Sequence, residues 1–143
     1  MENMENLIKN LPGKIREEFL KQIELFESKM KQKPGLMEKY EENTKKIQED
    51  ENLRNQYLEE GAQRFKTSDV NNDGRLNLEE YMNYVNLSFK QNKERFGDWI
   101  EYTDDEKKDY FRILDELSPE PGVSQEDQRK GMMIYYILKN EKK

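Results

Sequence analysis

Residues 69–80, with the sequence DVNNDGRLNLEE, carry oxygen-bearing side chains at alternate positions, a spacing that could bind a metal ion. Asp69, Asn71 and Asp73 stand at positions 1, 3 and 5 of this stretch, and Glu80 stands at position 12. A hard divalent cation such as calcium takes about six to eight oxygen ligands, so a short loop surrounds it only if alternate residues point inward. The stretch is therefore a candidate calcium loop.

Further residues between these positions complete the pattern. Gly74 at position 6 allows a sharp turn, Arg75 at position 7 offers its backbone carbonyl, and Asn77 at position 9 can hold a water molecule. The stretch resembles the EF-hand calcium-binding loop at each position that defines the loop, and Leu76 matches the family's apolar residue at position 8. The resemblance implies one calcium ion, bound with an affinity of ~10⁻⁷–10⁻⁵ M. The ligands that it implies are Asp69, Asn71, Asp73, Arg75, Asn77 and Glu80.

Two other interpretations of the loop are possible. An acidic surface turn collects the same residue types, but it does not require the helical patterns that flank this loop, with Phe65 before it and Tyr81 after it. Magnesium could use the same oxygens, but it prefers a smaller octahedral shell, and Glu80 at position 12 favours the larger ion. We therefore expect calcium, with magnesium as a competitor. Ser68 departs from the family pattern, which usually has an apolar residue there.

A second loop follows the first, and its sequence departs from the EF-hand pattern. The entering side makes Asp115 position 1, whereas the exiting side makes Val123 position 8 and Asp127 position 12, so the loop has thirteen residues instead of twelve. In the exit register Pro121 takes the glycine position, where its ring opposes a left-handed turn. We expect this hand to be structural and not to bind calcium, while Val123 still pairs with Leu76.

Apolar residues recur at spacings of three and four along most of the chain, which predicts an all-α fold. We expect an N-terminal helical hairpin at 1–50 and, from the resemblance, a paired EF-hand at 51–143, with an intact first hand at 53–92 and a degenerate second hand at 103–140. The expected apolar faces contain, in chain order, Ile15, Phe19, Ile23, Phe26 and Met30; Leu36, Met37, Tyr40 and Ile47; Leu53, Tyr57, Leu58, Ala62 and Phe65; Leu78, Tyr81, Tyr84, Val85 and Phe89; Tyr110, Phe111, Ile113 and Leu114; and Met132, Met133, Tyr136 and Ile137.

Start and stop signals divide these helices. Thr103 and Glu106 have the spacing of a capping box, and Ser124 is a candidate N-cap. Gly97 breaks one helical pattern, and Pro119 requires another helix to end before it. Between these helices the single tryptophan, Trp99, is expected to anchor a linker on the core.

Composition limits the classes of function. The chain has 143 residues, enough for one compact domain, with 33% hydrophobic and 39% charged residues. It has no cysteine and no histidine, which excludes thiol chemistry and the commonest general base, so we do not expect an enzyme. A net charge of −6 suits neither nucleic acid nor anionic lipid. The apolar run at 132–138 is too short to span a bilayer, and residues 1–10 lack the features of a signal peptide, so we expect a cytoplasmic protein.

Two functions are compatible with these sequence features. The first is a calcium-responsive regulatory or adaptor subunit that exposes apolar surface to a protein partner. The second is a structural module of a larger assembly, for which the resemblance suggests cytoskeletal or ciliary hosts; a calcium buffer fits less well. The hairpin at 1–50 could dock on the EF-hand pair or on a partner. Residues that could line a partner surface, but that at helical spacing more often belong to a core, are Tyr81, Met82, Tyr84, Val85, Met132 and Met133.

Overall fold

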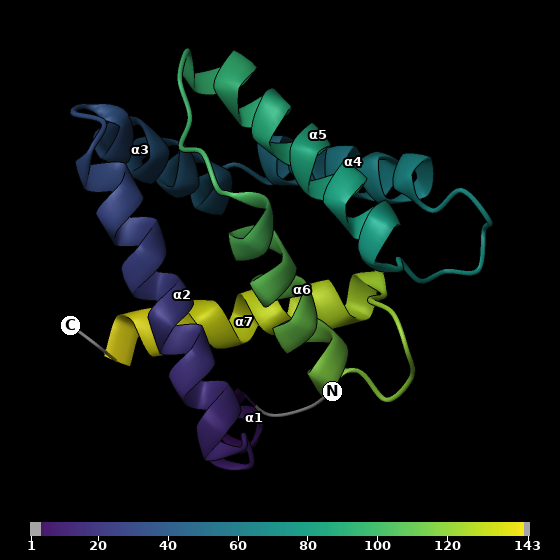
Figure 1. The fold of residues 1–143 in the computed structure, drawn as a ribbon. Coiled ribbons are helices and arrows are strands. Elements are labelled where there is room, and N and C mark those ends of the chain that lie inside the picture. Colours follow the sequence, from purple (N-terminus) through teal and green to yellow (C-terminus); the bar gives the residue numbers. More distant parts are fainter. Residues whose placement is uncertain (1–3, 142–143) are drawn as a thin grey trace.

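The computed structural model describes residues 4–141, and within them the protein is all-helical, as predicted. Residues 1–3, at the start of the segment assessed for a signal peptide, lie outside this range. The described helices, shown in Figure 1, are α1 (Met4–Lys9), α2 (Gly13–Lys31), α3 (Leu36–Glu49), α4 (Glu51–Ser68), α5 (Leu78–Phe96), α6 (Asp104–Leu117) and α7 (Gln125–Glu141). The short helix α1 was not predicted from the sequence.

Helices α4 and α5 flank one loop, and α6 and α7 flank another. The two loops meet through an antiparallel bridge between Leu76 and Val123, in which each residue's N–H donates to the other's carbonyl, at 2.8 and 2.9 Å. Both side chains are fully buried. The predicted pairing of these residues is confirmed.

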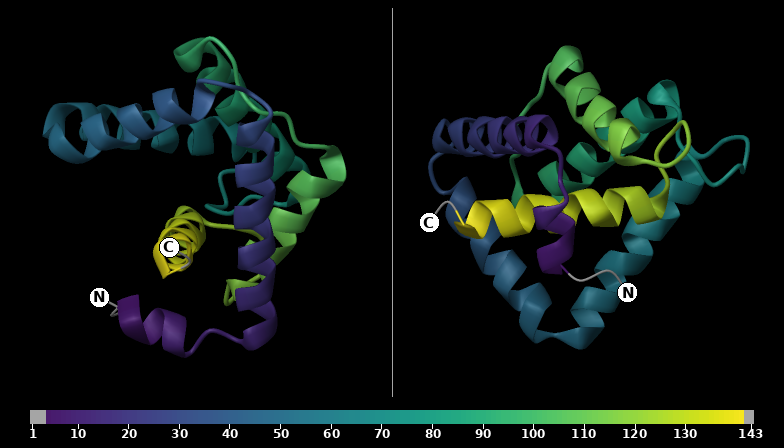
Figure 2. Two further views of the ribbon diagram at one scale, coloured as in Figure 1. Left: turned by 90° about the vertical axis from the view of Figure 1, so that its left-hand side faces the viewer. Right: turned by 90° about the horizontal axis from the view of Figure 1, so that it is seen from below.

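Helix α2 is packed against the second helix–loop–helix unit. It crosses α7 and also contacts α6 (Figures 1 and 2). Its residues Phe19 and Ile23 are fully buried in one core cluster with Ile113 of α6 and with Ile134 and Leu138 of α7. The N-terminal segment therefore covers part of the α6–α7 unit.

Helix α3 packs chiefly against α4 and also contacts α5 and α2. The left view of Figure 2 shows α3 running away from the axis of α2 instead of lying along it. A cluster of buried side chains joins the α2–α3 corner to the linker after α5, and it contains Met30, Leu36, Trp99 and Ile100. The predicted anchoring of the linker by Trp99 is confirmed. Whether 1–50 and 51–143 are separate domains stays a prediction.

The predicted helix boundaries agree with the structure at several points. Thr103 and Glu106 form both hydrogen bonds of a capping box at the start of α6. Helix α5 ends at Phe96, and the capping residue Gly97 has a φ of 80°, a left-handed conformation that costs glycine little. Helix α6 ends at Leu117, before Pro119.

Three predicted apolar faces were wrong in part; in α5 the exposed member is Leu78, at 38%. In α7, Met132 and Tyr136 are 68% and 50% exposed, whereas Gly131, Ile134 and Leu138 are buried. The buried residues of α7 lie on a different face from the predicted one because this helix contacts both α2 and α6. Gly131 allows α6 to approach closely, since a side chain there would meet Leu114. In α4, Leu58 is 67% exposed, since only the C-terminal part of that helix enters the core.

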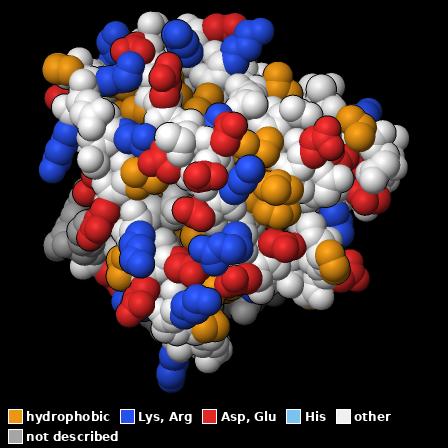
Figure 3. Space-filling model, in the orientation of Figure 1, with side chains coloured by type: hydrophobic (Ala, Val, Ile, Leu, Met, Phe, Trp, Pro, Cys, Tyr) orange, Lys and Arg blue, Asp and Glu red, His pale blue; other side chains and the backbone are white. Residues whose placement is uncertain are grey.

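On the face shown in Figure 3, acidic and basic side chains are interspersed, and hydrophobic side chains appear in small separate patches. None of the helices formed by residues 4–141 is both long enough and apolar enough to cross a membrane.

Candidate metal centre and its neighbouring loop

The first loop begins and ends with residues that also belong to the helix termini. Asp69 is the C-terminal cap of α4, and its N–H donates to the Phe65 carbonyl at 2.9 Å. Asn77 is the N-cap of α5, and with Glu80 it forms a capping box. Two of the predicted ligands thus also start helix α5, because Asn and Glu at this spacing satisfy free backbone N–H groups.

Side-chain oxygens in the first half of the loop accept hydrogen bonds from backbone N–H groups further along it. Asp69 Oδ2 accepts from Gly74 at 2.8 Å, and Asp73 Oδ1 accepts from Arg75 at 2.9 Å. Gly74 has a φ of 79°, as the predicted sharp turn requires. Asn71 Oδ1 accepts from Asp73 at 3.3 Å. These bonds orient the oxygens at positions 1, 3 and 5 within one turn of chain.

Glu80 closes the loop from its other end. Its Oε1 accepts from the Asn77 N–H at 3.0 Å, and its Oε2 accepts from the Val70 N–H at 2.9 Å. Only 4% of Glu80 and 6% of Asp69 are exposed, whereas Asn71, Asp73 and Asn77 are exposed. The last ligand position is therefore tied to the second residue of the loop.

The residues present fit a calcium ion in type and order, but their carboxylates are not gathered on one point. Across residues 4–141 no three acidic side chains are placed to hold a metal ion together. The loop's other oxygens come from asparagine side chains and a backbone carbonyl, which are ordinary calcium ligands. An ion bound here would compete with the Asn77 and Val70 N–H groups for the two carboxylate oxygens of Glu80.

The Arg75 side chain leaves the first loop and enters the second. Its Nε donates to the Pro121 carbonyl at 2.8 Å, and its Nη2 faces the carbonyls of Glu120 and Gly122, each at 2.9 Å. Nη2 also contacts Ser118 Oγ and, at 3.0 Å, Asp127 Oδ2. From the sequence only the backbone carbonyl of Arg75 was given a role, and the role of its side chain was not predicted. The sequence did hold a signal for this contact. Arg75 directly precedes Leu76, and the expected pairing of Leu76 with Val123 brings the arginine close to the second loop and its Asp127.

The second loop shows how its thirteenth residue is accommodated. In both loops the last acidic position comes four positions after the bridge residue, Glu80 after Leu76 and Asp127 after Val123. The extra residue therefore lies before the bridge, where Asp115 Oδ1 accepts from the Gly122 N–H at 2.8 Å. Gly122 has a φ of 89°, so the left-handed turn that Pro121 could not make falls on the next residue.

Asp127 lies in the first turn of helix α7 and forms an ion pair with Arg75. Its Oδ2 accepts from the Ser124 N–H at 3.0 Å, and its own N–H donates to Ser124 Oγ at 3.1 Å, which makes the predicted Ser124 cap. Burial raises the pKa of Asp127, but hydrogen bonds from Ser124 and Ser118 and the charge of Arg75 outweigh it and hold the pKa below its ordinary value. The carboxylate is thus ionised and paired.

Four of the residues considered for a partner surface, Tyr81, Tyr84, Val85 and Met132, line a cavity of about 360 Å³. Phe26 of α2 and Tyr40 of α3 line its other side. Burial raises the pKa of Tyr81 and of Tyr110, another lining residue, because the phenolate would lose its hydration. In this cavity the N-terminal helices α2 and α3 face helices α5, α6 and α7.

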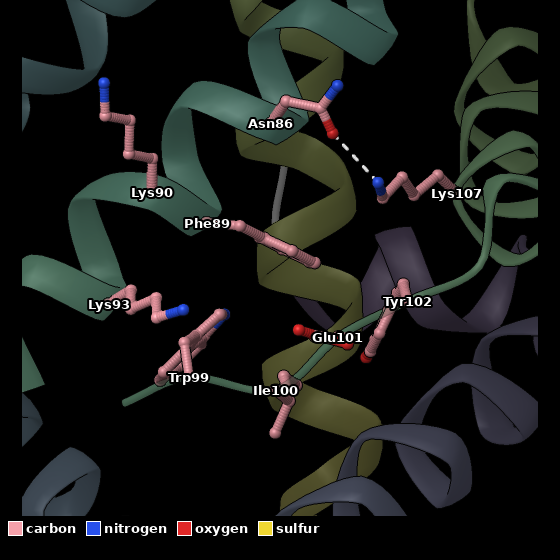
Figure 4. Close-up of a pocket in the computed structure, with 9 residues that line it drawn as sticks. All are labelled: Asn86, Phe89, Lys90, Lys93, Trp99, Ile100, Glu101, Tyr102 and Lys107. Carbon is pink, nitrogen blue, oxygen red and sulfur yellow. Dashed lines mark hydrogen bonds between the residues drawn. The ribbon is translucent and has the colours of Figure 1, made fainter. Parts of the chain in front are cut away.

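A second cavity, of about 390 Å³, lies where the linker passes α5 (Figure 4). Lys90, Lys93 and Lys107 border it, and Lys107 Nζ donates to Asn86 Oδ1 at 2.9 Å. Trp99 lines both cavities, and its ring stacks on Phe96 with centroids 5.5 Å apart. The environment of Trp99 therefore depends on the positions of α5 and the linker.

No protein-family model matches the chain, and neither a curated protein nor a solved structure matches it. The function of the candidate metal centre is therefore inferred from its own residues.

Proposed function

We propose that this chain is a calcium-binding EF-hand protein with one ion site at residues 69–80, acting as a calcium-responsive regulatory or adaptor subunit. The observation that carries the proposal is the first loop itself. It combines six oxygen-bearing positions with a left-handed Gly74 and with Asp69 accepting from the Gly74 N–H at 2.8 Å. The bridge from Leu76 to Val123 supports its pairing with a second hand that has lost its ion.

The hydrogen bonds of Glu80 indicate how an ion would act on the fold. Calcium at this site takes both carboxylate oxygens, which now accept from Asn77 and Val70. Glu80 lies in the first turn of α5, so turning its side chain toward an ion would break its capping bond with the Asn77 N–H and disturb the start of that helix. The proposed response is a reorientation of α5 relative to α4.

A movement of α5 would reach the cavity of about 360 Å³. Tyr81, Tyr84 and Val85 are α5 residues that line it, with Phe26 and Tyr40 of the N-terminal helices opposite. Calcium would then loosen α2 and α3 from helices α5, α6 and α7. This would uncover aromatic surface for a helical segment of a protein partner. In this mechanism the N-terminal helices mask the partner surface until calcium binds.

A structural module in a larger assembly is the second candidate, and the packing of α2 favours it. Phe19 and Ile23 are fully buried against α6 and α7, so separating α2 would expose a large apolar area. In that case calcium would stabilise the first loop without moving the helices.

Calcium titration of the wild-type protein and of Glu80→Gln tests both candidates. Calorimetry counts the ions bound, Trp99 fluorescence follows α5 and the linker, and hydrogen exchange reports protection helix by helix. Glu79→Gln is the matched control, because this neighbouring glutamate is exposed and outside the ligand set. A magnesium titration measures the competitor.

We expect one calcium ion, a Hill coefficient near one, and loss of binding in Glu80→Gln but not in Glu79→Gln. Zero or two ions bound would refute the single-site proposal. A calcium-dependent change in the exchange of α2 and α5, with increased binding of a hydrophobic dye, supports the regulatory function. Protection confined to 69–80, with no dye response, supports the structural module instead.

A further inference from the structure

The second loop surrounds a cation that the chain itself supplies. Around Arg75 Nη2 lie two backbone carbonyls, the Ser118 hydroxyl and the Asp127 carboxylate, and the Pro121 carbonyl accepts from Nε. The three carbonyl oxygens and the Asp127 carboxylate oxygen lie 2.8 to 3.0 Å from the nitrogens. Carbonyl, hydroxyl and carboxylate oxygens are also the ligand types that a calcium loop presents to its ion.

The contact pattern is that of ligands around a charge. Nη2 carries two hydrogens and faces four oxygens, so it cannot make a full hydrogen bond to each of them. The arginine side chain is 21% exposed and that of Asp127 is 8% exposed, so water screens the pair only weakly. Glu120 adds a second carboxylate at 3.7 Å from Nη1, at the exposed edge.

We propose that the second loop is a guanidinium-binding site, occupied by the Arg75 side chain in place of a metal ion. The occupant locks the thirteen-residue loop against the first loop and preserves the pairing of the two hands without a second calcium.

The charges in the loop favour a monovalent, planar occupant. Asp127 is the one carboxylate within 3.0 Å of Nη2, and Asp115 uses Oδ1 on the Gly122 N–H. One buried negative charge balances a guanidinium but not a divalent ion. A lysine ammonium could supply the charge, but it lacks the planar fork that reaches Pro121 through Nε and Asp127 through Nη2 together.

The position of Arg75 in the first loop leaves its side chain available for this role. Position 7 of a calcium loop contributes only its backbone carbonyl, so the side chain does not coordinate the first ion. The same residue would then bind calcium through its main chain and hold the second loop through its side chain. This last step rests on the proposed function, whereas the guanidinium site itself does not.

Chemical rescue tests the site in calcium-free buffer. Arg75→Ala removes the guanidinium, and Arg75→Lys keeps the charge without the fork. Guanidinium chloride at low millimolar concentration is then added, with tetramethylammonium chloride as a cation that has no N–H donors. Hydrogen exchange of the Gly122 and Val123 amides is the readout, and exchange in α2 verifies that each variant is folded. Arg129→Ala is the control, because that arginine pairs with Glu126 on the surface of α7.

We expect exchange in the second loop to be at least ~10-fold faster in Arg75→Ala, because charged hydrogen bonds are lost. Guanidinium should restore slow exchange and tetramethylammonium should not, while Arg75→Lys should remain faster than wild type. Arg129→Ala should exchange like wild type in this loop.

Unchanged exchange in folded Arg75→Ala, or equal effects of the two cations, would overturn the guanidinium site. Calcium titrations of the same proteins keep the two proposals separate. A wild-type protein that binds no calcium but shows the rescue refutes only the proposed function. One that binds calcium without showing the rescue refutes only the guanidinium site.

Discussion

Gly131 determines how closely α6 and α7 approach, and Gly131→Ala should therefore destabilise the protein. A Cβ at this position would lie 2.3 Å from Leu114 Cδ2 and 3.5 Å from the Tyr110 hydroxyl. Leu114 is 1% exposed and belongs to the cluster around the Leu76–Val123 bridge, so its side chain has little room to move. The substitution must shift either this side chain or the α7 backbone.

Two opposing effects set the magnitude. Overpacking a buried contact costs about 1–3 kcal/mol. Replacing a glycine in a helix interior by alanine contributes about 0.5–1 kcal/mol in the other direction, because the unfolded chain loses conformational freedom. The contact is well below van der Waals distance, so overpacking should dominate, with a net loss of roughly 1–2 kcal/mol.

Gly61→Ala in α4 is the matched control, since the same atom is added to another helix interior. Its nearest neighbour would be Arg64 Nη2 at 3.6 Å, an ordinary contact, so the free energy of unfolding should rise by about 0.5–1 kcal/mol. Urea unfolding followed by circular dichroism measures both variants. A Gly131→Ala variant as stable as the wild type, or stabilised as much as Gly61→Ala, would show that Leu114 does not resist the added methyl group.

Two further predictions concern single polar groups. Burial raises the pKa of Glu106, but hydrogen bonds from Thr103 and Lys29 outweigh it and hold the pKa below its ordinary value of 4.5. The contribution of ionised Glu106 to the free energy of unfolding should therefore be complete above pH 4.5 and lost as the pH falls through the lower pKa of the folded state. Urea titrations at several pH values should show Glu106→Gln to be about 0.5 kcal/mol less stable at neutral pH and equal to wild type in acid; a constant difference would contradict this. Ser68 is buried and its hydroxyl has no hydrogen-bond partner among the described residues. Ser68→Ala should raise the thermal midpoint, with a gain of about 1 kcal/mol, and a lower midpoint would show that the hydroxyl is paired.

The sequence by itself determined what depends on near neighbours along the chain. The capping box of Thr103 and Glu106 and the end of α5 before Gly97 depend on a few consecutive residues. The extra residue of the second loop followed from counting between Asp115 and Asp127, and the bridge of Val123 to Leu76 agrees with it. Calcium binding at 69–80 was inferred in the same way and stays a prediction.

Tertiary structure decided what depends on the neighbours across the fold. The periodicity of α7 allowed more than one buried face, and the positions of α2 and α6 selected Gly131, Ile134 and Leu138. An arginine at position 7 is free to point in many directions, and only the approach of the two loops brings Arg75 to Asp127. Side-chain direction and helix packing are set by groups distant in sequence, which is why they could not be derived from local spacing.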